Sequence, residues 1–152
     1  MSLEKKEIEA YLNQTKYVTL ATVDEKNVPS QRALGAFAVD GYTVYFNTQA
    51  NTKKTKDIGQ NSNVSLLFQH ESQELSTFVN VLVTGKAVAL STEADINEAV
   101  QVIGQRNVRF KERIAENGLG NNLLYRVEPT EVKVLDFKQG VGPNAIKIIA
   151  IN

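Results

Sequence analysis

Three lysines and three threonines fall within the segment NTQANTKKTKDI, residues 47–58, directly after a short apolar run. Where a strand gives way to a helix, the first backbone N–H groups of the helix have no partner and carry the positive end of the helix dipole. With Asn51 or Thr52 as the cap, these N–H groups, a threonine hydroxyl and the ammonium groups of Lys53 and Lys54 would point at one place. A phosphate group suits such a junction.

Arg32 offers a second wall for this anion site. It lies in the extended stretch VPSQRALGAFAV (28–39) and interrupts a strand whose other residues, ALGAFAV (33–39), are small and apolar. A type I′ turn at Asp40-Gly41 is predicted to fold this stretch back on the strand that leads into the lysine segment, so that the guanidinium forms a bidentate pair with the phosphate. From the residues alone an alternative stays open, in which the lysines are a solvated helix face and Arg32 is an ordinary surface arginine.

Composition narrows the classes of function. The 152 residues suit one domain, residues 1–152. Lysine plus arginine balance aspartate plus glutamate at 17 each, so the protein has no overall positive electrostatic field that attracts nucleic acid. Without cysteine, and with His70 as the single histidine, thiolate metal sites and histidine clusters are excluded. No run is long enough to span a bilayer, and the polar start lacks a signal peptide's apolar core, so we expect a soluble cytoplasmic protein without membrane contacts.

The elements that would position these residues are mainly strands. Periodicity and turn residues predict strands at 17–23, 28–39, 42–48, 63–68, 78–90 and 123–137, the last interrupted at Pro129. Helices are expected through Leu3, Ile8, Tyr11 and Leu12, at about 51–58 with Gly59 as the end, and after Ser91-Thr92 with a continuation through Phe110 and Ile114. Five or six strands in antiparallel neighbourhoods indicate a small β-barrel flanked by helices.

Four stretches of the chain together resemble a known family. They are TLATVDEKNVPSQRAL, VYFNTQANTKKTKDIGQNSNVSLLF, VNVLVTGKAVALS and YRVEPTEVKVLDF. This arrangement is similar to the FMN-binding split-barrel family related to pyridoxamine 5′-phosphate oxidase. The resemblance implies a mainly β fold, a small antiparallel split β-barrel with flanking helices. It also implies a homodimer with flavin sites at the subunit interface, completed by residues of the second subunit.

The resemblance assigns roles to particular residues. It implies that the phosphate of FMN is bound by Arg32, Thr52, Lys53 and Lys54. It places Phe46, Asn47 and Thr48 along the ribityl chain, and the backbone of Ala33 and Leu34 at the isoalloxazine edge. Asn80 stands where the strict oxidases carry a glutamine that reaches the flavin.

Two departures argue against pyridoxamine phosphate as the substrate. Phe37 replaces a phosphate-binding lysine, and the chain ends GVGPNAIKIIAIN without the oxidases' arginine-rich signature. We therefore expect an FMN flavoprotein that passes electrons from a reduced nicotinamide or similar donor to a small acceptor, with no catalytic side chain assigned. A non-catalytic module that binds flavin or haem, or a deazaflavin in place of FMN, stays open. His70 is either a haem ligand or, as we favour, an exposed loop residue, and the tail from Gly140 adds an edge strand or covers the partner's pocket.

Overall fold

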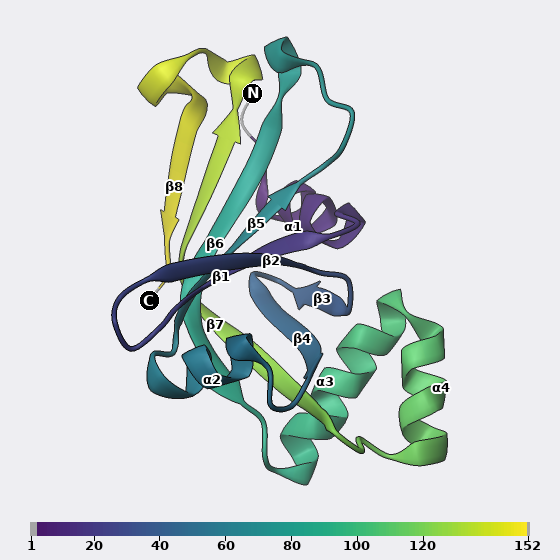
Figure 1. Ribbon diagram of the computed structural model, residues 1–152. Helices are drawn as coiled ribbons and strands as arrows, with labels where there is room; N and C mark the ends of the chain where they lie inside the picture. Colours follow the sequence, from purple (N-terminus) through teal and green to yellow (C-terminus); the bar gives the residue numbers. More distant parts are fainter. Residues whose placement is uncertain (1–2, 152) are drawn as a thin grey trace.

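Eight antiparallel strands form the frame of the protein, for which a computed structural model describes residues 3–151 (Figure 1). They pair in the order β2-β1-β5-β6-β7-β4-β3, with β8 added to β7. The strands are β1 (Val18–Val23), β2 (Pro29–Leu34), β3 (Phe37–Asp40), β4 (Thr43–Gln49), β5 (Asn63–Gln69), β6 (Val79–Ala89), β7 (Asn122–Asp136) and β8 (Ile146–Ala150). The predicted antiparallel barrel with flanking helices is confirmed.

The region predicted as one strand over 28–39 is two strands, so that prediction is wrong. The chain breaks at Gly35-Ala36; β2 pairs with β1 and β3 pairs with β4, which places them at opposite ends of the strand order. The tight turn after β3 is present, but its two loop residues are Gly41 and Tyr42, and only Gly41 has a positive φ, of 64°. That pattern fits a type II′ turn and not the predicted type I′.

Strand β7 runs without a break through Pro129, where an interruption was predicted. Pro129 lies opposite Gly85 at a register shift between β6 and β7, where the missing N–H is tolerated. A Cβ at Gly85 would lie 2.3 Å from the Glu128 carbonyl oxygen, so only glycine fits there. The first half of β7 pairs with β4 and the second half with β8, which confirms the tail as an edge strand.

Four helices flank the strands: α1 (Lys5–Gln14), α2 (Lys53–Gln60), α3 (Glu93–Arg106) and α4 (Val108–Asn117). Helix α2 continues through Gly59, which was predicted to end it. The predicted continuous helix through Phe110 breaks at Asn107, because that side chain accepts a hydrogen bond from the Phe110 N–H and so begins α4. Within residues 3–151 no helix combines the length and apolar character that crossing a membrane requires.

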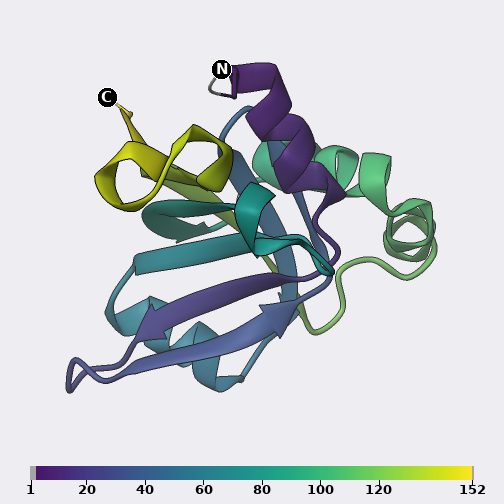
Figure 2. The same cartoon turned by 90° about the horizontal axis from the view of Figure 1, so that it is seen from above.

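The core has two parts, one inside the barrel and one between α3, α4 and the β3–β4 hairpin. Helix α2 packs against β1, and the β1–β2 hairpin lies beside it in both views (Figures 1 and 2). This packing brings the lysine segment close to residues of β1 and β2.

Candidate functional site

The first turn of α2 has the geometry of an anion site. Asn51, with φ of 62°, turns the chain out of β4, and Thr52 is the N-cap. The Thr52 hydroxyl accepts from the Thr55 N–H at 3.4 Å, while the Thr55 hydroxyl accepts from the Thr52 N–H at 3.1 Å. This capping box uses the N–H groups of Thr52 and Thr55. The N–H groups of Lys53 and Lys54, in the first turn, have no acceptor inside the helix.

Arg32 reaches this helix by a route that the sequence did not predict. Its Nη1 donates to the Thr22 hydroxyl of β1 at 2.7 Å, and its Nη2 lies 3.9 Å from Asp57 Oδ2 of α2. The turn at Gly41 holds β3, not β2, against β4, so the proposed route through that hairpin is wrong. The neighbourhood arises because β2 pairs with β1 and α2 packs on β1.

Asp57 joins the predicted cations and was missed from sequence. It is 2% exposed, and its carboxylate accepts from the Thr22 hydroxyl at 2.8 Å and from Lys53 Nζ at 3.1 Å. Burial raises the pKa of this carboxyl, but hydrogen bonds from Thr22 and Lys53 and the charges of Lys53 and Arg32 outweigh it, and the pKa lies below its usual value. The group is therefore ionised at neutral pH.

Lys54 differs from Lys53 because no acidic side chain among residues 3–151 pairs with it. It is half-buried. Burial, and then the nearby positive charge of Arg32, lower the pKa of Lys54 from its usual value. Two cations that repel each other across a partly dry site favour an anion between them.

The lowered pKa of Lys54 predicts a pH dependence for anion binding. Below that pKa the ammonium is charged, so the affinity for FMN should fall as the pH rises through it, at a pH below the usual 10.5. Fluorescence titration of FMN at several pH values checks this. Lys54→Arg, which stays charged throughout, should show a flatter profile, and equal profiles in the two proteins would contradict the assignment.

Three of the predicted residues point their side chains into the core. Leu34 and Thr48 are each 7% exposed, and Phe46 is fully buried and stacked on Tyr125 with ring centroids 5.0 Å apart. These side chains therefore leave little surface for a ligand. The expected contacts of Leu34 with the isoalloxazine edge, and of Phe46 and Thr48 with the ribityl chain, stay predictions.

Asn47 lies at the junction between the two strands that the sequence merged. Its backbone N–H donates to the Ala36 carbonyl at 2.9 Å, and its Nδ2 donates to Asn122 Oδ1 at 3.4 Å. Its Oδ1 is buried and has no hydrogen-bond partner among residues 3–151. An unpaired buried acceptor costs about 1–3 kcal/mol, so this amide is poised to gain from a donor.

The side chains of Ala33 and Asn80 lie on the outer face of the sheet, opposite to the face that carries Arg32. Side chains directly opposite each other on paired strands share a face, and the register forms the row Ala33, Thr19, Leu67, Leu82, Lys133 and Ile148. Asn80 stands in the next row, and its Nδ2 donates to Gln69 Oε1 at 3.3 Å. This outer face, half-buried or exposed along both rows, holds Leu67, Leu82, Leu135, Ile146 and Ile148.

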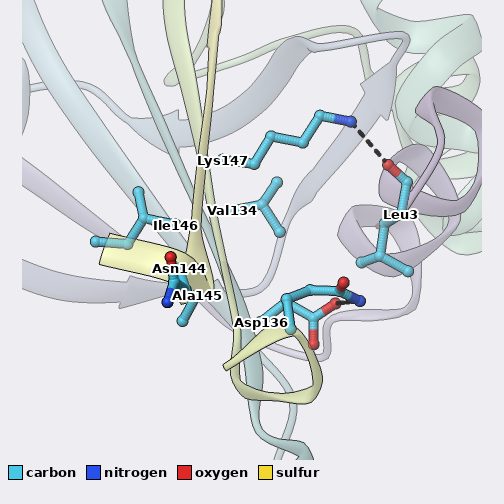
Figure 3. A pocket seen from close by; sticks show the side chains of 8 residues that line it. Leu3, Val134, Asp136, Asn144, Ala145, Ile146 and Lys147 are labelled. Carbon is cyan, nitrogen blue, oxygen red and sulfur yellow. Dashed lines mark hydrogen bonds between the residues drawn. The ribbon is translucent and has the colours of Figure 1, made fainter. Parts of the chain in front are cut away.

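Two pockets lie near these elements. A cleft of about 560 Å³ beside α2 is lined by Ala50, Asn51, Thr52, Lys53, Thr55, Lys56, Leu123 and Tyr125. Of the predicted phosphate-binding residues, it includes Thr52 and Lys53, whereas Arg32 and Lys54 are not among its lining residues. A smaller pocket of about 290 Å³ lies between Leu3 and the β7–β8 pair, with Asp136 and Lys147 in its wall, and contains no predicted site residue (Figure 3).

His70 is not the exposed loop residue that we favoured. It is half-buried, its ring stacks on Tyr11 with centroids 3.6 Å apart, and Nε2 lies 2.8 Å from the Tyr11 carbonyl oxygen. A ring nitrogen held in this way is not free to bind a haem iron without losing that contact.

Arg106 is a second residue that sequence reasoning missed. From the end of α3 its guanidinium donates to backbone carbonyls near the end of α1 and the start of β1, and to others between β2 and the first residue of β3. Its centre lies 3.9 Å from the Phe37 ring centroid. The carbonyls belong to Asn13, Thr15, Lys16, Gly35 and Phe37. Arg106 thus fixes the corner that follows Arg32, Ala33 and Leu34.

Comparison with known sequences shows which protein family this chain belongs to. A profile of the family described as Pyridoxamine 5′-phosphate oxidase matches residues 4–136, most of the chain. The chain belongs to the pyridoxamine 5′-phosphate oxidase family. A pyridoxine/pyridoxamine 5′-phosphate oxidase from Shewanella woodyi is 40% identical over 81 residues, which are 52% of this chain and 35% of that protein. The match therefore spans about a third of the length of that relative.

Solved structures share the fold of this pyridoxamine 5′-phosphate oxidase family member. A conserved hypothetical protein from Mycobacterium tuberculosis superposes with a TM-score of 0.76 at 17% identity, covering 91% of this chain and 88% of its own. The heme storage protein HutZ from Vibrio cholerae has a TM-score of 0.65 at 23% identity, with 85% and 91% covered. These likenesses confirm the predicted split-barrel fold.

Proposed function

We propose that this protein binds FMN noncovalently, with the flavin phosphate held by Arg32 and Lys54 at the first turn of α2. The observation that carries this proposal is the half-buried Lys54. The positive charge of Arg32 repels its ammonium, and no acid within residues 3–151 pairs with it. A phosphate between them would relieve the repulsion and accept hydrogen bonds from the N–H groups of Lys53 and Lys54. Membership of the pyridoxamine 5′-phosphate oxidase family supports FMN as the source of that phosphate.

The charge of the site suits a phosphate monoester. Arg32, Lys53 and Lys54 supply three positive charges and Asp57 removes one, which leaves two. A phosphate monoester carries about −1.5 to −2 at neutral pH. The positive charge of the site and the negative charge of the phosphate would therefore nearly cancel when FMN binds.

The outer face of the sheet supports a homodimer that completes the flavin site. Leu67, Leu82 and Ile148 lie on this face in a row that also holds Thr19 and Lys133. The row ends at Ala33, one of the two residues expected at the isoalloxazine edge. Apolar rows left half-exposed favour association with a second copy. In such a dimer the partner subunit would cover the flavin ring beside Ala33 and Asn80.

Bound FMN would supply the electron-accepting ring, and this chain would bind it, orient it and limit its contact with water. We propose that electrons pass from a reduced nicotinamide or a similar small donor to a small acceptor. Pyridoxamine phosphate oxidation is not proposed. Phe37, in place of the oxidases' lysine, is 1% exposed beneath Arg106 and offers no charge to a phosphate.

Visible absorbance of the purified protein tests this function. We expect a flavin spectrum, release of FMN on denaturation, and bleaching by a reduced nicotinamide under anaerobic conditions, followed by reoxidation with a small acceptor. A released deazaflavin, identified by mass, would correct the cofactor alone. Bound flavin that no donor reduces would make the protein a binding module, and a protein that takes up no flavin would contradict the proposal.

Haem binding is the second candidate because HutZ, which shares the fold, is described as a heme storage protein. A Soret band after addition of haem, in a protein that takes up no FMN, would favour haem binding. The stacking of His70 on Tyr11 argues against that histidine as the ligand. His70→Ala should therefore leave any haem spectrum unchanged.

Substitutions of two lysines in α2 distinguish a specific phosphate contact from general attraction of FMN by the positive charge of the helix. Lys54 is half-buried beside Arg32, whereas Lys56 is exposed. Lys54→Ala should weaken FMN binding by about 1.5 kcal/mol, roughly tenfold, while Lys56→Ala changes it by less than about 0.5 kcal/mol. Calorimetric titration of both variants checks this, and equal losses would mean that helix charge alone attracts the anion.

A further inference from the structure

A buried carboxylate inside a predicted anion site is the feature that calls for explanation. Asp57 repels any phosphate that enters, yet it is 2% exposed and its contacts all lie within the site. Its hydrogen bond from Thr22 joins α2 to β1. Its negative charge also changes the net charge that an anion meets at this position.

Asp57 neutralises Lys53 directly. Both carboxylate oxygens contact Lys53 Nζ, Oδ1 at 3.2 Å and Oδ2 at 3.1 Å, across one turn of α2. Lys53 is exposed, so without this pair its ammonium would stand beside the free N–H groups as a full third charge. The pair removes that charge from the first turn.

Asp57 also positions Arg32 through Thr22. The Thr22 hydroxyl donates its only proton to Asp57 Oδ2 at 2.8 Å, which leaves its lone pairs to accept from Arg32 Nη1 at 2.7 Å. Arg32 Nη2 lies 3.9 Å from the same carboxylate. Arg32 Nη1 also lies 3.4 Å from the carbonyl oxygens of Leu20 and Ser30, so Thr22 and Asp57 hold the guanidinium together with two backbone carbonyls.

We propose that Asp57 is the specificity-determining residue of this site, which cancels one positive charge so that a terminal phosphate monoester is preferred over anions that carry more charge. The proposal rests on the anion site described under the proposed function. With Asp57 the site carries two net positive charges, which suits a monoester, and without it three, which suits a diphosphate such as pyrophosphate. Asp57 thereby sets the class of ligand and not only its position.

Asp57→Asn tests this, because it keeps the acceptor for Thr22 and removes the charge. We expect the affinities for FMN and inorganic phosphate to rise about tenfold, as a nearby like charge is lost, and the affinity for pyrophosphate to rise further. Binding should also become more sensitive to salt. The matched control is Asp136→Asn, which removes another buried carboxylate, 3% exposed, in the smaller pocket of Figure 3, and should leave all three affinities unchanged.

A double variant keeps the test open if Asp57→Asn folds poorly. Lys53→Met with Asp57→Asn removes the ion pair as a unit and restores two net positive charges, so the preference between phosphate and pyrophosphate should return to that of the unmodified protein. A purely structural role for Asp57 predicts weaker binding of every anion, with an unchanged preference, in both variants. That result would overturn the inference.

The outcomes also separate this inference from the proposed function. If the unmodified protein binds phosphate but not FMN, the cofactor assignment fails while the shift in anion preference still tests Asp57. If FMN binds and Asp57→Asn changes neither affinity nor preference, the inference fails alone. If no anion binds either protein, both fail, whereas binding that appears only in Asp57→Asn supports the inference.

Discussion

Arg32→Ala is expected to weaken FMN binding by about 1.5–3 kcal/mol, roughly ten- to a hundredfold, the usual scale for losing a charge-assisted hydrogen bond. The variant removes one of the two cations that we place on the phosphate and leaves the buried Thr22 hydroxyl without its donor. Fluorescence titration of FMN measures the loss, and riboflavin, which lacks the phosphate, should bind both proteins equally.

Arg32→Lys is the informative companion to this variant. It keeps the charge but cannot donate to Thr22 and the phosphate through a planar fork, so an intermediate affinity is expected. If Arg32→Ala binds FMN as tightly as the unmodified protein, the phosphate is not at Arg32. If riboflavin affinity falls equally, the arginine acts on the fold and not on the phosphate.

Arg106→Ala is expected to lower the free energy of unfolding by about 2–4 kcal/mol, since hydrogen bonds from a charged group are worth about 1.5–3 kcal/mol each and carbonyls are left without their donor. Its guanidinium joins α3 to the end of α1, to the two chain connections that follow α1 and β2, and to the start of β3. The acceptors are the carbonyls of Asn13, Thr15, Lys16, Gly35 and Phe37. Chemical denaturation measures the change. Arg106→Ala should also weaken FMN binding, because the chain after Ala33 and Leu34 loses the contacts that hold it in place.

The control for this variant is Arg113→Ala on α4. Arg113 is exposed, and substitutions at such surface positions change stability by less than about 0.5 kcal/mol. Equal stability of Arg106→Ala and Arg113→Ala would show that the carbonyl contacts contribute nothing net. Loss of stability with full FMN affinity would mean that Arg106 supports the fold but not the flavin-facing backbone.

Much of the fold could be predicted because its signals are local. β-branched runs gave β1, β5 and β6 nearly to the residue, and Thr92 marked the start of α3 by accepting from the Asp95 N–H. The lysine segment was predicted to begin a helix at Asn51 or Thr52, and Thr52 is the cap. Such signals need only neighbours in the chain.

The errors came from pairings between distant residues. VPSQRALGAFAV reads as one extended stretch, yet it divides at Gly35 because β2 finds β1 and β3 finds β4. Pro129 was expected to interrupt β7, but Gly85, far away in sequence, makes room for the register shift. No local pattern carries that information.

For the site, the sequence by itself determined the family, the split-barrel fold and a concentration of positive charge at the strand-to-helix junction around Thr52. Only the tertiary structure decided that Arg32 meets α2 through Thr22, that Asp57 lies buried among these cations, and that Arg106 holds the corner beside them. The physical reason is that the pairing of strands and the packing of helices on them decide which charged groups come together and which are buried. An acid such as Asp57 looks solvated until the packing of α2 on β1 encloses it.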